Sequence, residues 1–458
     1  MEQTEKRQEN KMGVMPVKRL IITMSLPMMA SMLVQALYNI VDSIFVSRIG
    51  EDALTAVSLA FPVQTLMVAV AGGTGVGVNA LLSKSLGEKK FDEADRAANA
   101  GILLMFFSYI VFCLFGFFGA GKFFETQVDM SLPNAATIIS YGKSYLATCM
   151  ILSFGFLFEM MLERLLQATG KTFYTMITQG TGAIINIILD PILIFGYLGF
   201  PAMGIAGAAV ATVIGQVVAM VLAVIFNIKK NTDIHLSVRY MKPRAATIKT
   251  IYRVGVPSII MQAIGSVMTY GMNKILAPIS TTAVAVFGVY FKLNSFVYMP
   301  VFGLNNGLIP IVAYNYGARH KERILEAVRF SMMISVAIMF IGVCIFLSIP
   351  DKLLLMFDAS PTMLEIGTPA LRIISTHFIL AGCTIIIMST FQAFGEGFLS
   401  LMVSVLRQLL IILPVAYLLV KFAGLAYVWW SFPVAEMFAL SLSIIFFIRL
   451  YRTKIKTL

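Results

Sequence analysis

Charged residues are scarce in this sequence. Asp, Glu, Lys and Arg make up only 13% of its 458 residues, whereas 59% are hydrophobic. A typical soluble domain has about 25% charged residues, so a chain built only of soluble domains is excluded. A mean hydropathy of +0.86 over this length is more than one buried core would produce, and it predicts a polytopic membrane protein.

Cysteine and histidine are also rare. The 4 Cys fall in separate hydrophobic stretches and the 3 His are scattered, which argues against disulfides and a clustered metal site. We interpret His377, which lies in a hydrophobic stretch, as a hydrogen-bonded core residue. Gly170-Lys171-Thr172 resembles the end of a phosphate-binding loop, but Leu165 stands where that motif needs Gly. We therefore expect no enzyme activity, no cofactor and no resident metal.

Twelve hydrophobic stretches are long enough to cross a membrane, which takes about 20 apolar residues in a helix. They predict an all-α fold with spans near 20–47, 53–83, 97–120, 136–160, 172–196, 203–228, 250–273, 281–309, 327–349, 370–392, 398–420 and 424–448. The first 19 residues lack the apolar region of a signal peptide. We expect a tail (1–19), a first lobe (20–228), a connection (229–250), a second lobe (251–450) and a C-terminal tail (451–458).

Basic residues indicate how these helices are oriented. Most of the 35 Lys and Arg fall in the two tails and in loops on the same side, including Arg164 and Lys171 between the fourth and fifth helices. Cytoplasmic loops are enriched in Lys and Arg, so both termini are expected to be cytoplasmic. Because the charges are scattered over short loops, we expect no nucleic-acid partner.

The two halves of the chain resemble each other. A shift of 230 residues aligns 26–97 with 256–327 without a gap, so that Pro27 meets Pro257 and Gly77 meets Gly307. Six helices in each half make the repeat parallel and predict two pseudo-symmetric lobes, with the binding site at their interface. Small residues allow close helix packing, so the run Ala71–Gly77 is interpreted as a packing surface.

Asp42 is one of two acids that stand out in the first lobe, because an ionisable residue inside a membrane is costly and is a functional candidate. Gln35, Tyr38 and Asn39 precede it at spacings that place all four on one helix face. Such a polar stripe should face a cavity.

Asp190 is the second acid. Asn186 lies one turn before it, Gln179 two further turns back, and Pro191 loosens the helix at this point. At about 1.5 Å per residue, both acids fall in the outer half of the membrane, so they are expected to share one pocket that alternates between a proton and a cation. The alternative is that each acid only ends its helix near the headgroups.

The second lobe has a different set of polar residues. Met272 replaces Asp42 at the repeat position, although a polar stripe that includes Gln262 and Thr269 remains. The other charges inside predicted helices are Lys292, Arg407 and Glu436, whose roles stay open. The substrate cavity is expected to be lined by Gln35, Tyr38, Asn39, Gln179, Gln262, Thr269 and Lys292.

The chain resembles the multidrug and toxic compound extrusion (MATE) family, and most of all its bacterial branch of staphylococcal-type exporters. The resemblance rests on Ser25–Met29 (SLPMM), Val41–Val46 (VDSIFV), Asn186–Gly196 (NIILDPILIFG) and Ile311–Gly317 (IVAYNYG). It implies two six-helix lobes in a V around a central cavity, and export driven by H⁺ or Na⁺.

The same resemblance implies roles for individual residues. Asp42, Asn186 and Asp190 match coupling positions of the first lobe, and Pro27 matches a proline linked to bending of the first helix. Gly265 replaces the glutamate that one branch of the family uses for a second-lobe cation site. Coupling is therefore expected in the first lobe.

These observations predict a multidrug efflux antiporter of a bacterial plasma membrane, with H⁺ preferred to Na⁺. Its expected partners are membrane lipid and amphipathic, often cationic, substrates, and the chain is expected to be a monomer. A flippase for a lipid-linked substrate is an alternative on the same fold, and would need a basic cavity to which Lys292 and Arg407 could contribute. A membrane-embedded enzyme and a channel are weaker alternatives.

Overall fold

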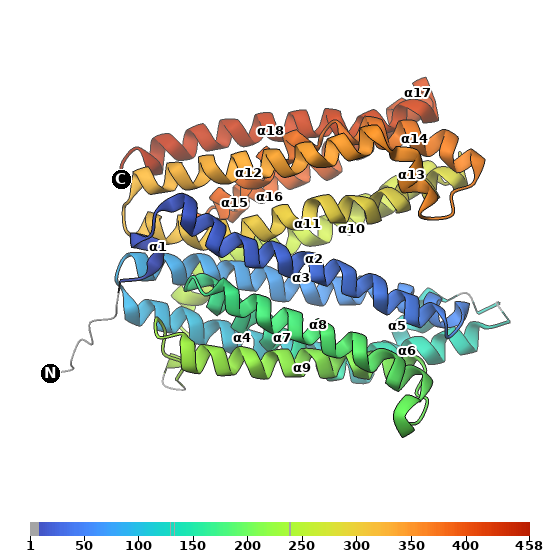
Figure 1. The fold of residues 1–458 in the computed structure, drawn as a ribbon, viewed down its shortest axis with the longest axis horizontal. Helices are drawn as coiled ribbons and strands as arrows, with labels where there is room; N and C mark the ends of the chain where they lie inside the picture. Colours follow the sequence, from blue (N-terminus) through green and yellow to red (C-terminus); the bar gives the residue numbers. More distant parts are fainter. Residues whose placement is uncertain (1–8, 129, 132, 238–239) are drawn as a thin grey trace.

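Long, roughly parallel helices make up the computed structural model of the chain (Figure 1). It describes residues 9–128, 130–131, 133–237 and 240–458. The α-helices of the first half are α1 (Lys11–Val14), α2 (Val17–Ser47), α3 (Glu51–Gly87), α4 (Phe91–Phe118), α5 (Ala120–Gln127), α6 (Ala135–Ile151), α7 (Phe154–Ala168), α8 (Thr172–Phe195) and α9 (Ile205–Lys230).

The second half repeats this arrangement. Its α-helices are α10 (Ala245–Leu276), α11 (Thr281–Gly317), α12 (Lys321–Ser348), α13 (Pro350–Leu355), α14 (Pro361–Ser375), α15 (Phe378–Ala393), α16 (Gly397–Val405), α17 (Leu413–Ala423) and α18 (Ser431–Leu450). The described residues also form two π-helical segments, η3 (Leu406–Ile412) and η5 (Tyr451–Ile455), and two 3₁₀ segments, η1 (Tyr197–Gly199) and η4 (Leu425–Trp430).

Local sequence explains where several of these helices begin and end. The side chains of Ser280 and Ser360 accept hydrogen bonds from the backbone N–H three residues later at the start of α11 and α14. Gly196 follows α8 with a φ of 77°, a left-handed conformation that glycine adopts without strain.

The prediction of twelve membrane spans is confirmed. Among the described residues, ten helices are long and apolar enough to cross a membrane, and two bent pairs can each form a further span. The bend is 44° between α6 and α7 and 46° between α14 and α15. Both pairs are the fourth span of their half, so the pseudo-symmetry extends to the broken helices.

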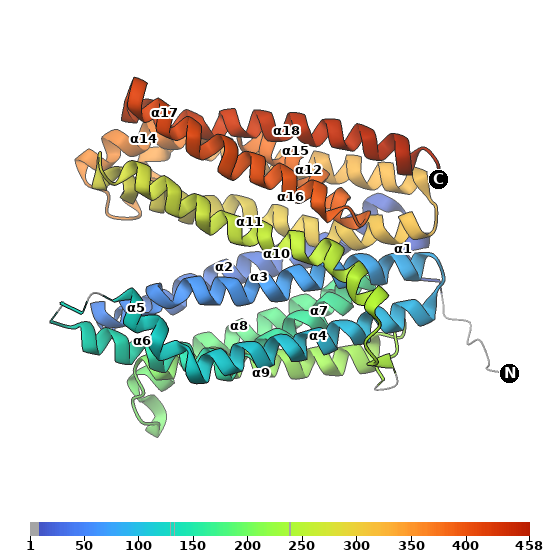
Figure 2. The ribbon, with the colours of Figure 1, turned by 180° about the vertical axis from the view of Figure 1, so that it is seen from behind.

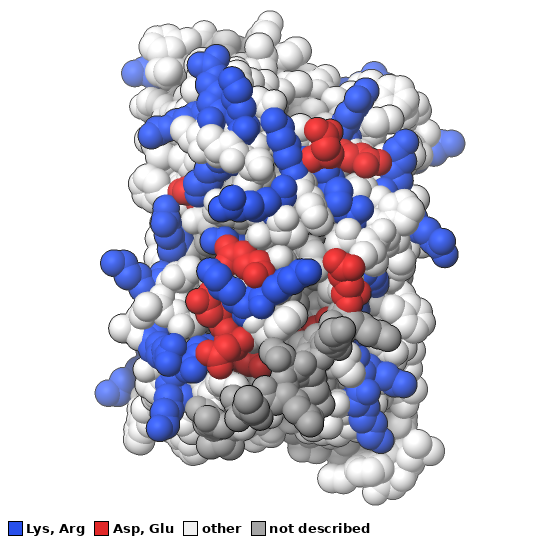
Figure 3. Space-filling model, turned by 90° about the vertical axis from the view of Figure 1, so that its left-hand side faces the viewer, with Lys and Arg blue, Asp and Glu red and all other residues white. Residues whose placement is uncertain are grey.

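The helices form two lobes that lie one above the other in Figures 1 and 2, with α2–α9 in one and α10–α18 in the other. Helix α1 and the C-terminus lie at the same end of the molecule, which we call the terminal end. Figure 3 shows this end, where Lys and Arg are spread over most of the face. The predicted arrangement of two six-helix lobes is confirmed.

Glycine residues bring the two lobes into contact. A Cβ on Gly73 of α3 would lie 2.5 Å from the side chain of Ile259, and one on Gly303 of α11 would lie 2.5 Å from Cα of Met29. Gly303 lies 230 positions after Gly73, and Ile259 lies 230 positions after Met29. The internal repeat therefore makes the same contact twice. The interpretation of Ala71–Gly77 as a packing surface agrees with this geometry.

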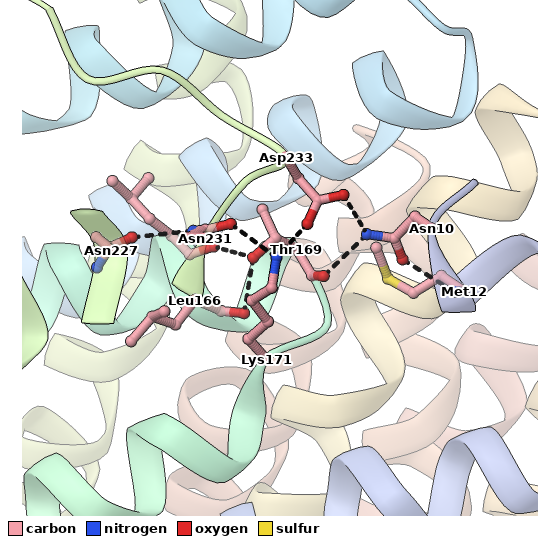
Figure 4. Close-up of polar contacts among 9 residues, drawn as sticks. Asn10, Met12, Leu166, Thr169, Lys171, Asn227, Asn231 and Asp233 are labelled. Carbon is pink, nitrogen blue, oxygen red and sulfur yellow. Dashed lines mark hydrogen bonds and ion pairs between the residues drawn. The ribbon is translucent and has the colours of Figure 1, made fainter. Parts of the chain in front are cut away.

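A polar network ties the N-terminal segment to the first lobe at the terminal end (Figure 4). The Asn10 amide donates to the carbonyl oxygen of Thr169 and to Oδ1 of Asp233, both at 3.0 Å. Lys171 pairs with Asp233 and donates to Oδ1 of Asn231 at 3.3 Å. The segment before α2 is therefore fixed against the start of α8 and the connection between the lobes.

The second lobe holds the same segment from the other side. Arg323 of α12 donates to the carbonyl oxygens of Met12 at 3.0 Å and Met15 at 2.7 Å, and Asn315 of α11 donates to Met12 at 3.1 Å. Residues 10–15 thus join both lobes at the terminal end, and we call them the N-terminal clasp.

Candidate functional site

Asp42 and Asp190 meet between two neighbouring helices of the first lobe. α2 and α8 pack side by side, and the two carboxyl groups interact through a hydrogen bond. Asp190 is fully buried. A hydrogen bond between two carboxyl groups requires a proton on one of them, so this pair is suited to hold a proton or a small cation.

Asn186 and Thr212 complete this group. With its nitrogen turned toward α2, the Asn186 amide donates to Oδ2 of Asp190 at 2.9 Å, and its oxygen accepts from Oγ1 and N of Thr212 at 3.1 and 3.0 Å. The hydroxyl of Tyr38 also interacts with Thr212. We call Asp42, Asn186, Asp190 and Thr212 the coupling site, after the role that the sequence predicts for the first three.

The coupling site retains free acceptor capacity. Oδ1 of Asp42 and Oδ1 of Asp190 are buried and accept no hydrogen bond within the described part of the chain. Carboxylate, amide and hydroxyl oxygens suit a hard cation. In the ranges that the structure describes, no group of three or more His, Cys, Asp or Glu could hold a metal ion.

A cavity begins next to the coupling site. It lies between α2, α7, α8 and α9, and we call it the first-lobe cavity. Gln35, Tyr38, Gln179 and Asn186 all line it. Three residues that were predicted to contact substrate therefore line the same cavity as one residue that was predicted to take part in coupling.

The other predicted cavity residues lie elsewhere. Asn39 is exposed, and Gln262 packs beside Gly72 at the lobe interface. Thr269 donates to the carbonyl oxygen of Gly265 on its own helix at 3.0 Å. Lys292 is exposed, and its Nζ lies 5.8 Å from the centre of the Phe357 ring.

Four polar residues of this region were not predicted. Thr212 contacts Asn186, while Glu159 and Glu163 line the first-lobe cavity together with Gln216. Thr212 and Gln216 are four residues apart in an otherwise apolar helix, a spacing that places them on one face and could have revealed them. The two glutamates show the same spacing.

The predicted fourth span was too short at its end. The expected range 136–160 left Glu163 and Arg164 in a loop, whereas α7 continues to Ala168. Arg164 is only 9% exposed and donates to Gln167 and to Asn306 of the second lobe, both at 2.9 Å. The prediction that Arg164 is a loop cation was therefore wrong, because its polar partners allow it to lie between the lobes.

Other ionisable residues of the second lobe have local partners. Arg407 in η3 pairs with Glu436 of α18 at 3.3 Å. The His377 ring contacts the hydroxyl of Tyr298 at 3.1 Å and the carbonyl oxygen of Ile374, as expected for a satisfied core histidine.

Pro27 lies inside the continuous helix α2. Proline has no backbone N–H and cannot donate a helical hydrogen bond. The Ser31 hydroxyl donates to the Pro27 carbonyl oxygen at 2.9 Å, which gives α2 an additional polar contact at this point.

Comparisons with known proteins agree with this architecture. The MatE family model matches residues 27–192 and 257–418, two segments whose starting residues are related by the shift of the internal repeat. The multidrug export protein MepA of Staphylococcus haemolyticus (strain JCSC1435) is 27% identical over 415 residues, covering 90% of this chain and 89% of that protein. MepA of Staphylococcus aureus (strain MSSA476) is 26% identical over 431 residues, covering 92% and 91%.

A solved structure shows the same fold over nearly the whole length. The outward-facing conformation of a multidrug resistance MATE family transporter of the MOP superfamily has a TM-score of 0.91 at 25% identity, covering 99% of both chains. Together with the two family-model matches, this likeness establishes that the chain belongs to the MatE family of membrane transporters.

Proposed function

We propose that the chain is a cation-coupled antiporter that exports amphipathic, often cationic, compounds, with H⁺ preferred to Na⁺ as the coupling ion. The carboxyl pair of Asp42 and Asp190 is the observation on which this proposal depends, because it adjoins a cavity whose wall includes Asn186 and Thr212. The relatives named as multidrug export proteins support export of small organic substrates.

Asn186 provides a direct link between ion binding and substrate binding. It donates to Asp190 and also lines the first-lobe cavity. A proton on Asp190 removes the charge that this amide faces, so the amide and Thr212 rearrange and the cavity changes shape. Transport follows when the ion and the substrate have different affinities for the inward-open and outward-open states.

The terminal end is proposed to face the cytoplasm of a bacterial cell. Lys and Arg are spread over this end (Figure 3), as expected for cytoplasmic loops. Arg164, the glycine contacts and the N-terminal clasp close the lobes together there, so this conformation is closed toward the cytoplasm. One chain contains both lobes, which supports the expectation of a monomer.

The flippase alternative is less well supported. It requires a basic cavity for an anionic headgroup, whereas the residues described around the first-lobe cavity include two glutamates and no Lys or Arg. Arg407, one of the two cations that favoured this alternative, pairs with Glu436.

Proteoliposomes with an imposed pH gradient or an imposed Na⁺ gradient test the proposal. We expect the pH gradient to drive efflux of an ethidium-type dye in the wild type, and Asp42→Asn and Asp190→Asn each to lower that efflux at least tenfold. Asp351→Asn, a change of an exposed acid in α13, is the matched control. If both variants at the coupling site export the dye like the wild type, the proposed coupling mechanism is wrong.

A further inference from the structure

Two glutamates of α7 line the first-lobe cavity and have no role in the coupling site. Glu159 and Glu163 are four residues apart, so both face the same side of α7, and both belong to the cavity wall. The cavity also contacts Asn186 of the coupling site. The two acids therefore share one space with the group that responds to the coupling ion.

The two carboxylates differ in how they are held. Glu163 is 1% exposed, and its oxygens accept hydrogen bonds from Oγ1 of Thr178 at 2.5 Å and from Nε2 of Gln179 at 2.7 Å. Glu159 is only partly buried and makes no hydrogen bond or ion pair with any described residue. Glu163 is thus a fixed part of the wall, whereas Glu159 presents a carboxylate to the cavity without a protein partner.

The nearest basic residues do not neutralise this carboxylate. Arg164 follows Glu163 directly, yet it donates to Gln167 and to Asn306 across the lobe interface. Lys171, the next cation along the chain, pairs with Asp233. The described wall of the cavity therefore contains two acidic side chains and no Lys or Arg.

A second, independent observation points to a ligand in this cavity. Oε1 of Gln179 is buried and accepts no hydrogen bond from the described residues, although the nitrogen of the same amide is fixed on Glu163. A buried acceptor without a donor costs free energy. A bound molecule with an N–H or O–H group would satisfy this oxygen from inside the cavity.

The rest of the wall suits the apolar part of such a molecule. Phe156 lies one turn before Glu159, and Met160 and Tyr38 also line the space. Aromatic rings attract cations, and methionine adapts to ligands of different shape. An acid among these side chains fits an organic cation better than an inorganic ion.

We propose that Glu159 recognises the positive charge of organic-cation substrates, separately from the Asp42–Asp190 pair that binds the coupling ion. This inference rests on the proposed export function and assigns the substrate class to the first-lobe cavity. Asn186 lies between the two groups, so binding of the coupling ion weakens substrate binding without direct competition for one carboxylate.

Equilibrium binding of radiolabelled tetraphenylphosphonium to the purified full chain in detergent tests this proposal without requiring transport. We expect Glu159→Gln to weaken binding at least tenfold, and Glu159→Asp to recover part of the affinity. A neutral aromatic dye of similar size should bind the wild type and Glu159→Gln equally. Glu125→Gln, a change of an exposed acid in α5, should leave both affinities unchanged.

Two results would overturn the assignment. One is tetraphenylphosphonium binding by Glu159→Gln at wild-type affinity, and the other is the absence of binding to the wild type. Equal melting temperatures of wild type and variant would show that a loss of binding is not a loss of folding. A different result would separate the two proposals. If neither ion gradient drives dye efflux but tetraphenylphosphonium binding still depends on Glu159, the antiport proposal is refuted while the proposed role of Glu159 is not.

Discussion

Gly77 of α3 and Gly307 of α11 occupy equivalent positions of the internal repeat, and each lets its helix touch the opposite lobe. A Cβ on Gly77 would lie 2.2 Å from the carbonyl oxygen of Ile251, and one on Gly307 would lie 2.4 Å from the hydroxyl oxygen of Ser25. The obstacle is backbone in the first case and a rotatable side chain in the second.

This difference predicts unequal effects of the same substitution. Gly77→Ala should destabilise the closed lobes more than Gly307→Ala, because Ser25 can turn away whereas the Ile251 backbone cannot. Overpacking costs about 1–3 kcal/mol, and we expect Gly77→Ala near the upper end. Melting temperatures in detergent would measure this order. Gly180→Ala, where nothing lies within 4 Å, is the control, and equal losses at positions 77 and 307 would contradict the prediction.

Thr212 is expected to affect coupling without being essential to it. Thr212→Val removes the hydroxyl that donates to Asn186 while its backbone N–H remains. This hydroxyl holds the amide that stabilises the charged form of Asp190, and one hydrogen bond contributes about 1 kcal/mol, so the variant should need roughly fivefold less H⁺ for half-maximal dye efflux. Thr148→Val, whose hydroxyl bonds only within α6, should show no such shift.

The pair of Arg407 and Glu436 should be tested as a unit. Glu436→Gln leaves the arginine without its acid partner at 3.3 Å, so it should lower the melting temperature by several degrees. Breaking a buried pair on one side is more damaging than replacing both partners by apolar residues. The double variant Arg407→Met/Glu436→Met is therefore expected to melt above the single variant, and the reverse order would refute this account.

The N-terminal clasp should favour the state that is closed at the terminal end. Asn10→Ala removes the two hydrogen bonds that join the clasp to the first lobe, to Thr169 and Asp233, and also the one that Asn10 accepts from the backbone N–H of Met12. At about 1 kcal/mol each, their loss should raise the population open at this end about tenfold or more. Spin-label distances between positions 228 and 320 would report the opening, with Thr250→Ala as control because its hydroxyl bonds only within α10.

Docking of the clasp is also expected to depend on pH through Lys11. Burial and the nearby charge of Lys171 lower the pKa of Lys11 below its usual value of 10.5, although Asp233 opposes this. Between this lowered pKa and 10.5, Lys11 carries a proton more often in the undocked segment than in the docked one. Docking therefore releases protons and becomes more favourable as pH rises through this range. Lys11→Met should dock at least as tightly and abolish this pH dependence in the same spin-label measurement.

The sequence predicted the fold well because hydrophobic length and the shift of 230 residues report on it directly. It also identified Asp42, Asn186 and Asp190, since polar residues in apolar helices are conspicuous. Glu163 escaped prediction because a neighbouring arginine made the end of α7 look like a loop.

Contacts between distant segments could not be predicted from the sequence. Nothing in the spacing of Arg164 and Asn306 shows that they bond, and the position of Lys292 away from the first-lobe cavity depends on how the lobes pack. These features arise from tertiary packing, which periodicity does not encode.

The doubled glycine contacts also bear on how the two halves of the chain fit together. Each half offers the other the surface that it receives, as the two subunits of a twofold dimer do, and such an arrangement is complete after one pairing. The connection between the halves places this dimer-like arrangement within a single polypeptide. Each half can then carry its own chemistry, so the acid pair of one lobe faces a lobe in which Arg407 pairs with Glu436.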